Sequence, residues 1–189
     1  MNRFAVLLLL VSGAATAAEI RSLDVRFEDG FYTMESTVWF DAGLESTYEM
    51  FSRWDRSEEF SSAIVEARDL EPGDDGRPGF FVRNRGCILF FCKSLTREGW
   101  VEREQDVALR AVADPERSDF KVSNETWTFV AAEGGTIITY HLYMSPDFWV
   151  PPAIGPYMIK RKLSRDAGRA LDRIEALAQE LERKNAQLD

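Results

Sequence analysis

The end of the chain carries a helical hydrophobic pattern that is long for a protein of 189 residues. From Pro152 to about Arg183, apolar residues recur at spacings of three and four, which predicts one amphipathic helix. The residues that set this pattern are Ile159, Leu163, Ala167, Ala170, Leu171, Ile174, Leu177, Ala178 and Leu181. An amphipathic helix has to cover another apolar surface, so the preceding part of the chain must supply one.

The chain before this helix alternates between strand patterns and turns. Strands are predicted at residues 20–27, 31–40, 63–71, 79–86, 93–102, 107–113, 123–132 and 136–144. Asp29-Gly30 and Gly134-Gly135 are typical of hairpin turns, and two short helices are predicted at 44–54 and 56–62. A mostly antiparallel sheet followed by one long helix is an α+β arrangement.

This order of elements resembles the helix-grip fold of START-like domains, the superfamily that includes polyketide cyclases/dehydrases and coenzyme-Q-binding START proteins. The resemblance is nearest to the coenzyme-Q-binding type. The residues that carry it are Phe40-Asp41-Ala42 and segments 60–65, 124–129 and 147–152. It implies a curved antiparallel sheet wrapped around the long C-terminal helix, with an apolar cavity for a hydrophobic ligand between them. A lipocalin barrel is the alternative fold, but its helix would precede the last strand.

Residues 1–18 have the composition of a secretory signal peptide. Arg3 precedes the apolar run 4–11, and the small residues that follow suit signal peptidase, with cleavage after Ala17 or Ala18. The apolar run is much shorter than the ~20 residues of a membrane-spanning helix. We therefore expect residues 19–189 to form one exported START-like domain, periplasmic in a Gram-negative bacterium.

The predicted cavity lining comes from the apolar faces of the first long strand and the last strand, from two aromatic residues between them, and from the start of the helix. These residues are Tyr32, Met34, Val38, Phe40, Trp127, Phe129, Ile138, Tyr140, Leu142, Met144, Ile159 and Leu163. Arg83, Arg85 and Arg97 are candidate anchors for an anionic head group, with ordinary surface positions as the alternative.

Antiparallel order also predicts which connections share one end of the sheet. Segments 87–92, 114–122 and 145–152 should be neighbours, and two of them are unusually apolar. The predicted membrane-contacting rim comprises Phe90, Phe91, Phe148 and Trp149, with Lys160, Arg161, Lys162 and Arg165 beside them. The alternative is that these aromatic residues belong to the core.

The two cysteines, Cys87 and Cys92, would face each other across a hairpin, and an exported protein meets an oxidising compartment. We expect a disulfide, with two free thiols as the alternative. A metal site is not expected, because two cysteines and the single histidine cannot complete a zinc site.

No catalytic motif stands out. The chain has no Gly-x-Ser-x-Gly, no His-Glu-x-x-His and no phosphate-binding glycine loop. His141 is expected to point away from the cavity. A net charge of −9 disfavours nucleic-acid binding, and no cofactor is expected.

Three hypotheses remain. The first is a non-enzymatic carrier or sensor for a lipid or isoprenoid-like ligand. The second is a cyclase, dehydrase or hydrolase that uses the same cavity. The third is a module that docks a membrane protein.

Overall fold

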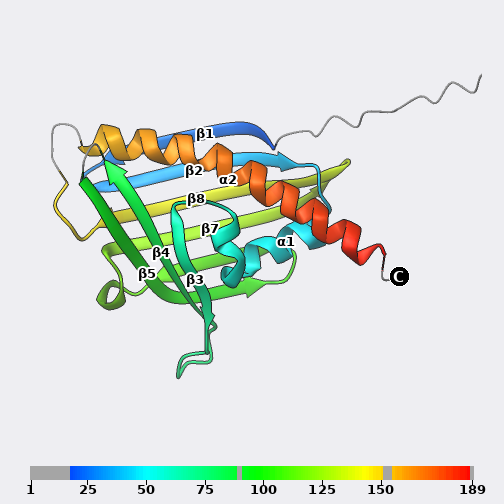
Figure 1. Cartoon of the computed structure of the whole chain (residues 1–189), viewed down its shortest axis with the longest axis horizontal. Helices are drawn as coiled ribbons and strands as arrows, with labels where there is room; N and C mark the ends of the chain where they lie inside the picture. The colour runs from blue at the N-terminus through cyan, green and yellow to red at the C-terminus, as the bar shows by residue number, and fades with distance from the viewer. Residues whose placement is uncertain (1–17, 89–90, 151–154, 188–189) are drawn as a thin grey trace, which may run out of the picture.

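The computed structural model describes residues 18–88, 91–150 and 155–187. The predicted signal peptide therefore lies outside the described residues, apart from Ala18. The strands are β1 (Glu19–Glu28), β2 (Phe31–Phe40), β3 (Ile64–Leu70), β4 (Gly79–Ile88), β5 (Phe91–Glu104), β6 (Ala108–Ala113), β7 (Phe120–Ala132) and β8 (Gly135–Pro146). They form one antiparallel eight-stranded sheet in the order β1-β2-β8-β7-β6-β5-β4-β3 (Figure 1).

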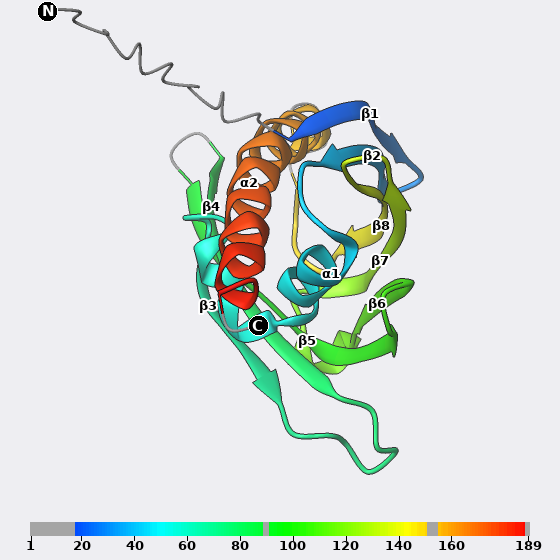
Figure 2. The ribbon, with the colours of Figure 1, turned by 90° about the vertical axis from the view of Figure 1, so that its right-hand side faces the viewer.

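The helical segments are α1 (Leu44–Ser52), η1 (Trp54–Glu59), η2 (Pro115–Arg117) and α2 (Gly155–Asn185). The sheet curves around α2, so that β3 and β4 lie on one side of the helix and β1 and β2 on the other (Figure 2). α1 packs beside the later part of α2 inside this curve. In the part of the chain that the structure describes, no helix has an apolar stretch long enough to cross a membrane.

The concave face of the sheet is apolar because the strand sequences alternate. On β2, Tyr32, Met34, Val38 and Phe40 are all buried, and the residues between them are more exposed except at Ser36. Successive side chains on a strand point to opposite faces, so the buried set faces the helix.

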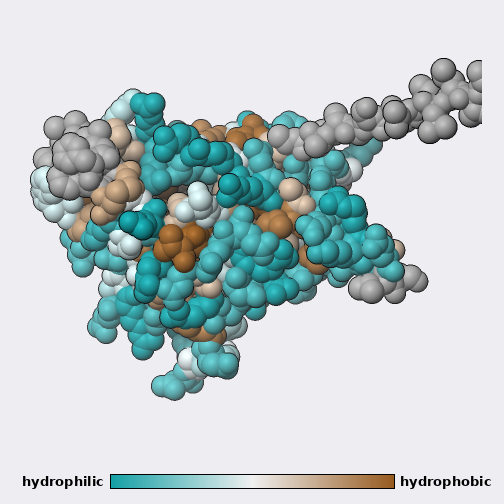
Figure 3. Space-filling view, in the orientation of Figure 1, coloured by the Kyte–Doolittle hydropathy of each residue, from teal (hydrophilic) through white to brown (hydrophobic). Residues whose placement is uncertain are grey.

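The apolar side chains of the interior fall into two clusters. The α1-side cluster surrounds α1 and the later half of α2, and it includes Phe40, Met50, Phe80, Leu109 and Phe129. The rim-side cluster, packed against the first half of α2, consists of Val25, Tyr32, Met34, Phe120, Leu142 and Met144. The visible face of the molecule is mostly hydrophilic, with hydrophobic surface only in small separate spots (Figure 3).

The later half of α2 is tied to the connection between β2 and α1. The Asp41 backbone N–H donates to Glu175 Oε1 at 2.8 Å, and the Gln179 side-chain amide donates to the Asp41 carbonyl at 2.8 Å. Glu175 is buried, and burial raises the pKa of its carboxyl. The helix is thus positioned by polar contacts as well as by its apolar stripe.

The observed elements differ from the expected ones mainly at their ends. Two strands begin two or more residues earlier than predicted, at Phe91 and Phe120. The segment expected as a second helix over 56–62 is the 3-10 helix η1. Gly99 lies within β5 opposite Ala113, the last residue of β6, where a Cβ atom would lie 2.0 Å from the Val112 carbonyl oxygen. Only glycine permits this close approach.

Candidate functional site

The predicted cavity residues on β2 and β8 lie on the concave face, opposite one another. The register pairs Tyr32 with Met144, Met34 with Leu142, and Val38 with Ile138. All six side chains are buried, and Phe40 continues the same face. Strand alternation thus brings these residues together on one buried apolar face.

The remaining predicted lining residues lie next to this surface, on β7 and β8 and on the facing helix α2. Trp127 on β7 lies opposite Tyr140 on β8, with ring centroids 5.2 Å apart. Phe129 is buried in the α1-side cluster. Ile159 and Leu163 of α2 pack against the rim-side cluster. The predicted lining therefore spans both clusters.

A buried ion pair lies within this apolar lining. Arg97 of β5 binds Glu125 of β7, and their side chains are only 18% and 8% exposed. β6 ends at Ala113, opposite Gly99, so the Arg97 side chain can reach β7 across the end of β6. Burial lowers the pKa of Arg97, because a low-dielectric environment penalises its charged form.

Tyr140 lies close enough to Arg97 for the two to interact electrostatically. Burial raises the pKa of the Tyr140 phenol, and the nearby guanidinium opposes this shift. The phenol therefore stays protonated at neutral pH. It can donate or accept a hydrogen bond but does not act as a base.

The sequence analysis named Arg97 as an anchor but missed Glu125. The signal was available, because alternation along 123–129 places Glu125 on the same face as Trp127 and Phe129. The other two candidate anchors lie elsewhere: Arg83 pairs with Glu66, and Arg85 is exposed. His141 is exposed on the convex face beside Glu35, as expected.

Several buried polar atoms have no hydrogen-bond partner among the described residues. They are Tyr32 OH, Tyr48 OH, Trp54 Nε1, Arg97 Nε and Trp100 Nε1. A buried polar group without a partner costs about 1–3 kcal/mol, so each of these atoms favours a hydrogen-bonding molecule beside it, water included.

A pocket of about 320 Å³ opens at the end of the sheet where the β1–β2 hairpin meets the start of α2. Its lining is Phe27, Gly30, Tyr32, Lys121, Ser145, Pro146, Phe148, Val150 and Pro156. Tyr32 also belongs to the rim-side cluster, so the pocket adjoins the apolar interior. The volume is at the lower end of the range of ligand pockets.

The three connections expected at one rim do lie together. The Asp147 backbone N–H donates to the Asp119 carbonyl at 2.9 Å, which joins the second and third connections. Lys93 directly follows the first connection, and its Nζ lies 4.2 Å from the centroid of the Phe148 ring, which places the first connection near the third. The pocket therefore opens at this rim.

The predicted rim residues differ in exposure. Trp149 is 78% exposed, whereas Phe148 is partly buried and contacts Phe120. Tyr157, which the sequence analysis did not single out, is 63% exposed on the first turn of α2. Phe90 and the side chain of Phe91 lie outside the described residues.

The basic residues beside the rim lie on two sides of α2. Lys160, Arg161 and Arg165 are exposed. Lys162 is turned toward β4 and pairs with Asp166 on the helix itself. Arg165 also pairs with Asp166, at 3.4 Å, so Lys160 and Arg161 are the two of these four cations without an ion pair among the described residues.

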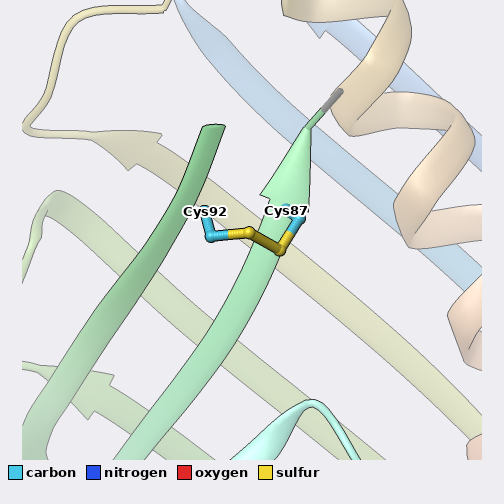
Figure 4. The surroundings of a disulfide bond; sticks show 2 residues. All are labelled: Cys87 and Cys92. Atoms are coloured by element: carbon cyan, nitrogen blue, oxygen red, sulfur yellow. A yellow bond between two sulfur atoms is a disulfide. The ribbon is translucent and has the colours of Figure 1, made fainter. Parts of the chain in front are cut away.

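The disulfide is present between Cys87 and Cys92, which are directly opposite each other on β4 and β5 (Figure 4). Their Cα atoms are 3.9 Å apart. The hairpin is tighter than the four-residue loop expected, because the strands continue to Ile88 and from Phe91. Within the described residues, no group of three His, Cys, Asp or Glu side chains is placed to bind a metal ion.

Comparison with known proteins identifies the fold. No protein-family model matches the chain, and no curated protein matches its sequence. A START superfamily protein from Mycobacterium smegmatis superimposes with a TM-score of 0.59 at 18% identity, covering 77% of this chain and 98% of that one. A STAR-related lipid transfer protein from Xanthomonas axonopodis gives 0.61 at 12%, covering 83% and 98%.

An enzyme shares the same architecture. The Zhui aromatase/cyclase from a Streptomyces species superimposes with a TM-score of 0.57 at 13% identity, covering 79% of this chain and 94% of that one. These likenesses show that the chain has the START-like helix-grip fold that its sequence predicted. At such identities they show the fold alone, and the site has to be interpreted from its own residues.

Proposed function

We propose that this protein is a non-enzymatic carrier or sensor that holds a hydrophobic ligand between the curved sheet and α2. The observation that carries this proposal is the pocket at the rim, whose lining is mainly Phe, Tyr, Pro and Val and which adjoins the rim-side cluster. Ligand pockets are typically apolar with few polar groups. Lys121 and Ser145 supply polar groups in the pocket, and Arg97, Glu125 and Tyr140 supply them deeper in the interior. The lipid transfer protein of the same fold is consistent with this function.

The proposed place of action is outside the cytoplasm, in a periplasm. Two observations support it: the signal-peptide composition of residues 1–18, and the disulfide between Cys87 and Cys92. Structural disulfides persist in oxidising compartments and are rare in reducing ones.

We further propose that the rim touches a membrane while the ligand is loaded. Exposing lipid chains to water costs about 0.8 kcal/mol per CH₂, so a carrier gains by pressing its pocket against the bilayer. Trp149 and Tyr157 are exposed there, and Lys160, Arg161 and Arg165 lie beside them. Aromatic and basic side chains of this kind favour the membrane interface and anionic head groups.

Extraction of the purified protein with organic solvent, followed by mass spectrometry, tests the carrier function. Lys121 lines the pocket and its side chain is 66% exposed, so Lys121→Trp should block the pocket without disturbing the core. Arg110→Trp is the matched control, because Arg110 is exposed on β6 and does not line the pocket.

We expect a bound hydrophobic compound in extracts of the wild type and of Arg110→Trp, and much less in extracts of Lys121→Trp. If the wild type yields no such compound and binds no added apolar probe, the proposal is wrong.

A cyclase or dehydrase acting on an apolar substrate is the second candidate. The specific observation is that a carboxylate, a guanidinium and a phenol meet in the interior, in a fold that an aromatase/cyclase shares. The phenol stays protonated and the carboxylate is held by Arg97, which favours binding over proton transfer. Turnover of a bound ligand that is lost in Tyr140→Phe, while ligand binding is retained, would support the enzyme instead.

A further inference from the structure

Three of the unpartnered polar atoms can only donate hydrogen bonds: the indole nitrogens Trp54 Nε1 and Trp100 Nε1, and Arg97 Nε of the guanidinium group. Trp100 lies on the convex face under Arg77, which leaves Trp54 Nε1 and Arg97 Nε as the donors for the interior. The tyrosine hydroxyls can donate or accept. Among the described residues, none of the unpartnered buried side-chain atoms is a pure acceptor such as a carboxylate oxygen.

Both donors lie on the concave side of the sheet. The Trp54 ring is stacked on Phe80 of β4 with centroids 4.4 Å apart, and it meets the Trp127 ring edge-on at 6.1 Å. Arg97 is paired in the ladder with Val82, which faces the same way as Phe80 two residues earlier. The two donors therefore lie on the same interior face, near β4, β5 and β7.

The two opposite charges in this region neutralise each other. Arg97 is bound to Glu125, and both side chains are largely buried. An anionic ligand group would have to displace Glu125 and leave its carboxylate buried without a partner. A cationic group would likewise have to displace Arg97. Both exchanges are unfavourable in a buried site, whereas an uncharged group leaves the ion pair intact.

We propose, on the premise that the interior binds a hydrophobic ligand as described above, that this ligand is uncharged and carries a carbonyl oxygen. That oxygen accepts a hydrogen bond from Trp54 Nε1, and Arg97 Nε is a second unpartnered donor on the same interior face. Ketones and esters satisfy this requirement, whereas fatty acids and long-chain amines do not.

The test uses four probes of equal carbon number: dodecane, methyl undecanoate, dodecanoate and dodecylamine. Equilibrium dialysis of each radiolabelled probe against the purified protein gives its dissociation constant. Trp54→Phe removes one donor and keeps an aromatic ring. Trp100→Phe is the matched control, because Trp100 also has an unpartnered ring nitrogen but lies on the convex face under Arg77.

We expect the wild type to bind the methyl ester more tightly than the carboxylate or the amine. Trp54→Phe should weaken ester binding by about three- to tenfold relative to dodecane binding, which corresponds to the loss of one hydrogen bond. Trp100→Phe should change neither.

Three results would overturn the inference while leaving the carrier function intact. They are tighter binding of dodecanoate than of the ester, tighter binding of dodecylamine than of the ester, and an equal effect of Trp54→Phe on ester and dodecane. If no probe binds, not even dodecane, the carrier function itself fails and the inference fails with it.

Discussion

Removing one partner of the Arg97–Glu125 pair should destabilise the fold far more than removing both. In Arg97→Met the Glu125 carboxylate, only 8% exposed, would stay buried without its counter-ion. Breaking a buried ion pair in this way typically costs 3–5 kcal/mol. Because Arg97 is 18% exposed and retains some solvent, we expect a loss of about 3 kcal/mol.

The double variant Arg97→Met with Glu125→Leu replaces the pair by apolar side chains. Its stability should be close to that of the wild type, since such exchanges are often neutral or stabilising. Arg110→Met is the control for a solvent-exposed pair, because Arg110 and Glu102 are 50% and 45% exposed, and it should cost less than about 1 kcal/mol.

Urea unfolding with the disulfide intact measures these differences. With a urea dependence of about 1–3 kcal/mol per molar, Arg97→Met should lower the midpoint by at least about 1 M. If it costs no more than Arg110→Met, water reaches the pair and the interior around it is not dry. That result would refute the reasoning about the buried charges.

Three further predictions concern the rim, the hairpin and α2. Phe148→Ser combined with Trp149→Ser should weaken co-sedimentation with anionic liposomes while circular dichroism stays unchanged, and high salt should weaken it only partly; unchanged binding would contradict the membrane-docking proposal. Peptide mapping without reductant should recover Cys87 and Cys92 linked, and two free thiols would contradict the pairing. Burial raises the pKa of Glu175 above 4.5. The protonated carboxyl therefore contributes to the free energy of unfolding at low pH, and this contribution is lost as pH rises through the raised pKa. Glu175→Gln should therefore stabilise the protein at neutral pH and reduce the loss of stability as pH rises above 4.5; a variant as pH-dependent as the wild type would show that Glu175 is solvated.

The fold was predictable because hydrophobic periodicity carries its main features. Alternation on β2 and β8 and the helical spacing of α2 identify both layers and the faces that meet. The ends of the strands were harder to predict from the sequence. β5 begins at Phe91, and segment 87–92 contains none of the usual turn residues. A strand that continues through an apolar hairpin cannot be distinguished from an apolar loop by periodicity alone.

The interior site was predictable only in its apolar part. The lining residues follow from alternation, but the ion pair depends on the length of β6, which determines that Arg97 reaches β7. The length of β6 depends on how the whole sheet assembles, and the local sequence pattern does not determine it. Trp54 was missed for a similar reason, because the residue lies in a short helical segment whose packing against β4 has no periodic signal in the sequence.

The bond between Cys87 and Cys92 also acts on the rest of its hairpin. It holds the two residues directly opposite each other, and the same ladder pairs Val82 with Arg97. A shift of β5 by one residue against β4 would exchange its two faces, turning Arg97 toward solvent and Glu98 toward the interior. Because two linked cysteines cannot accommodate that shift, the disulfide excludes a misfolded alignment in which the sheet would form with the wrong charge inside.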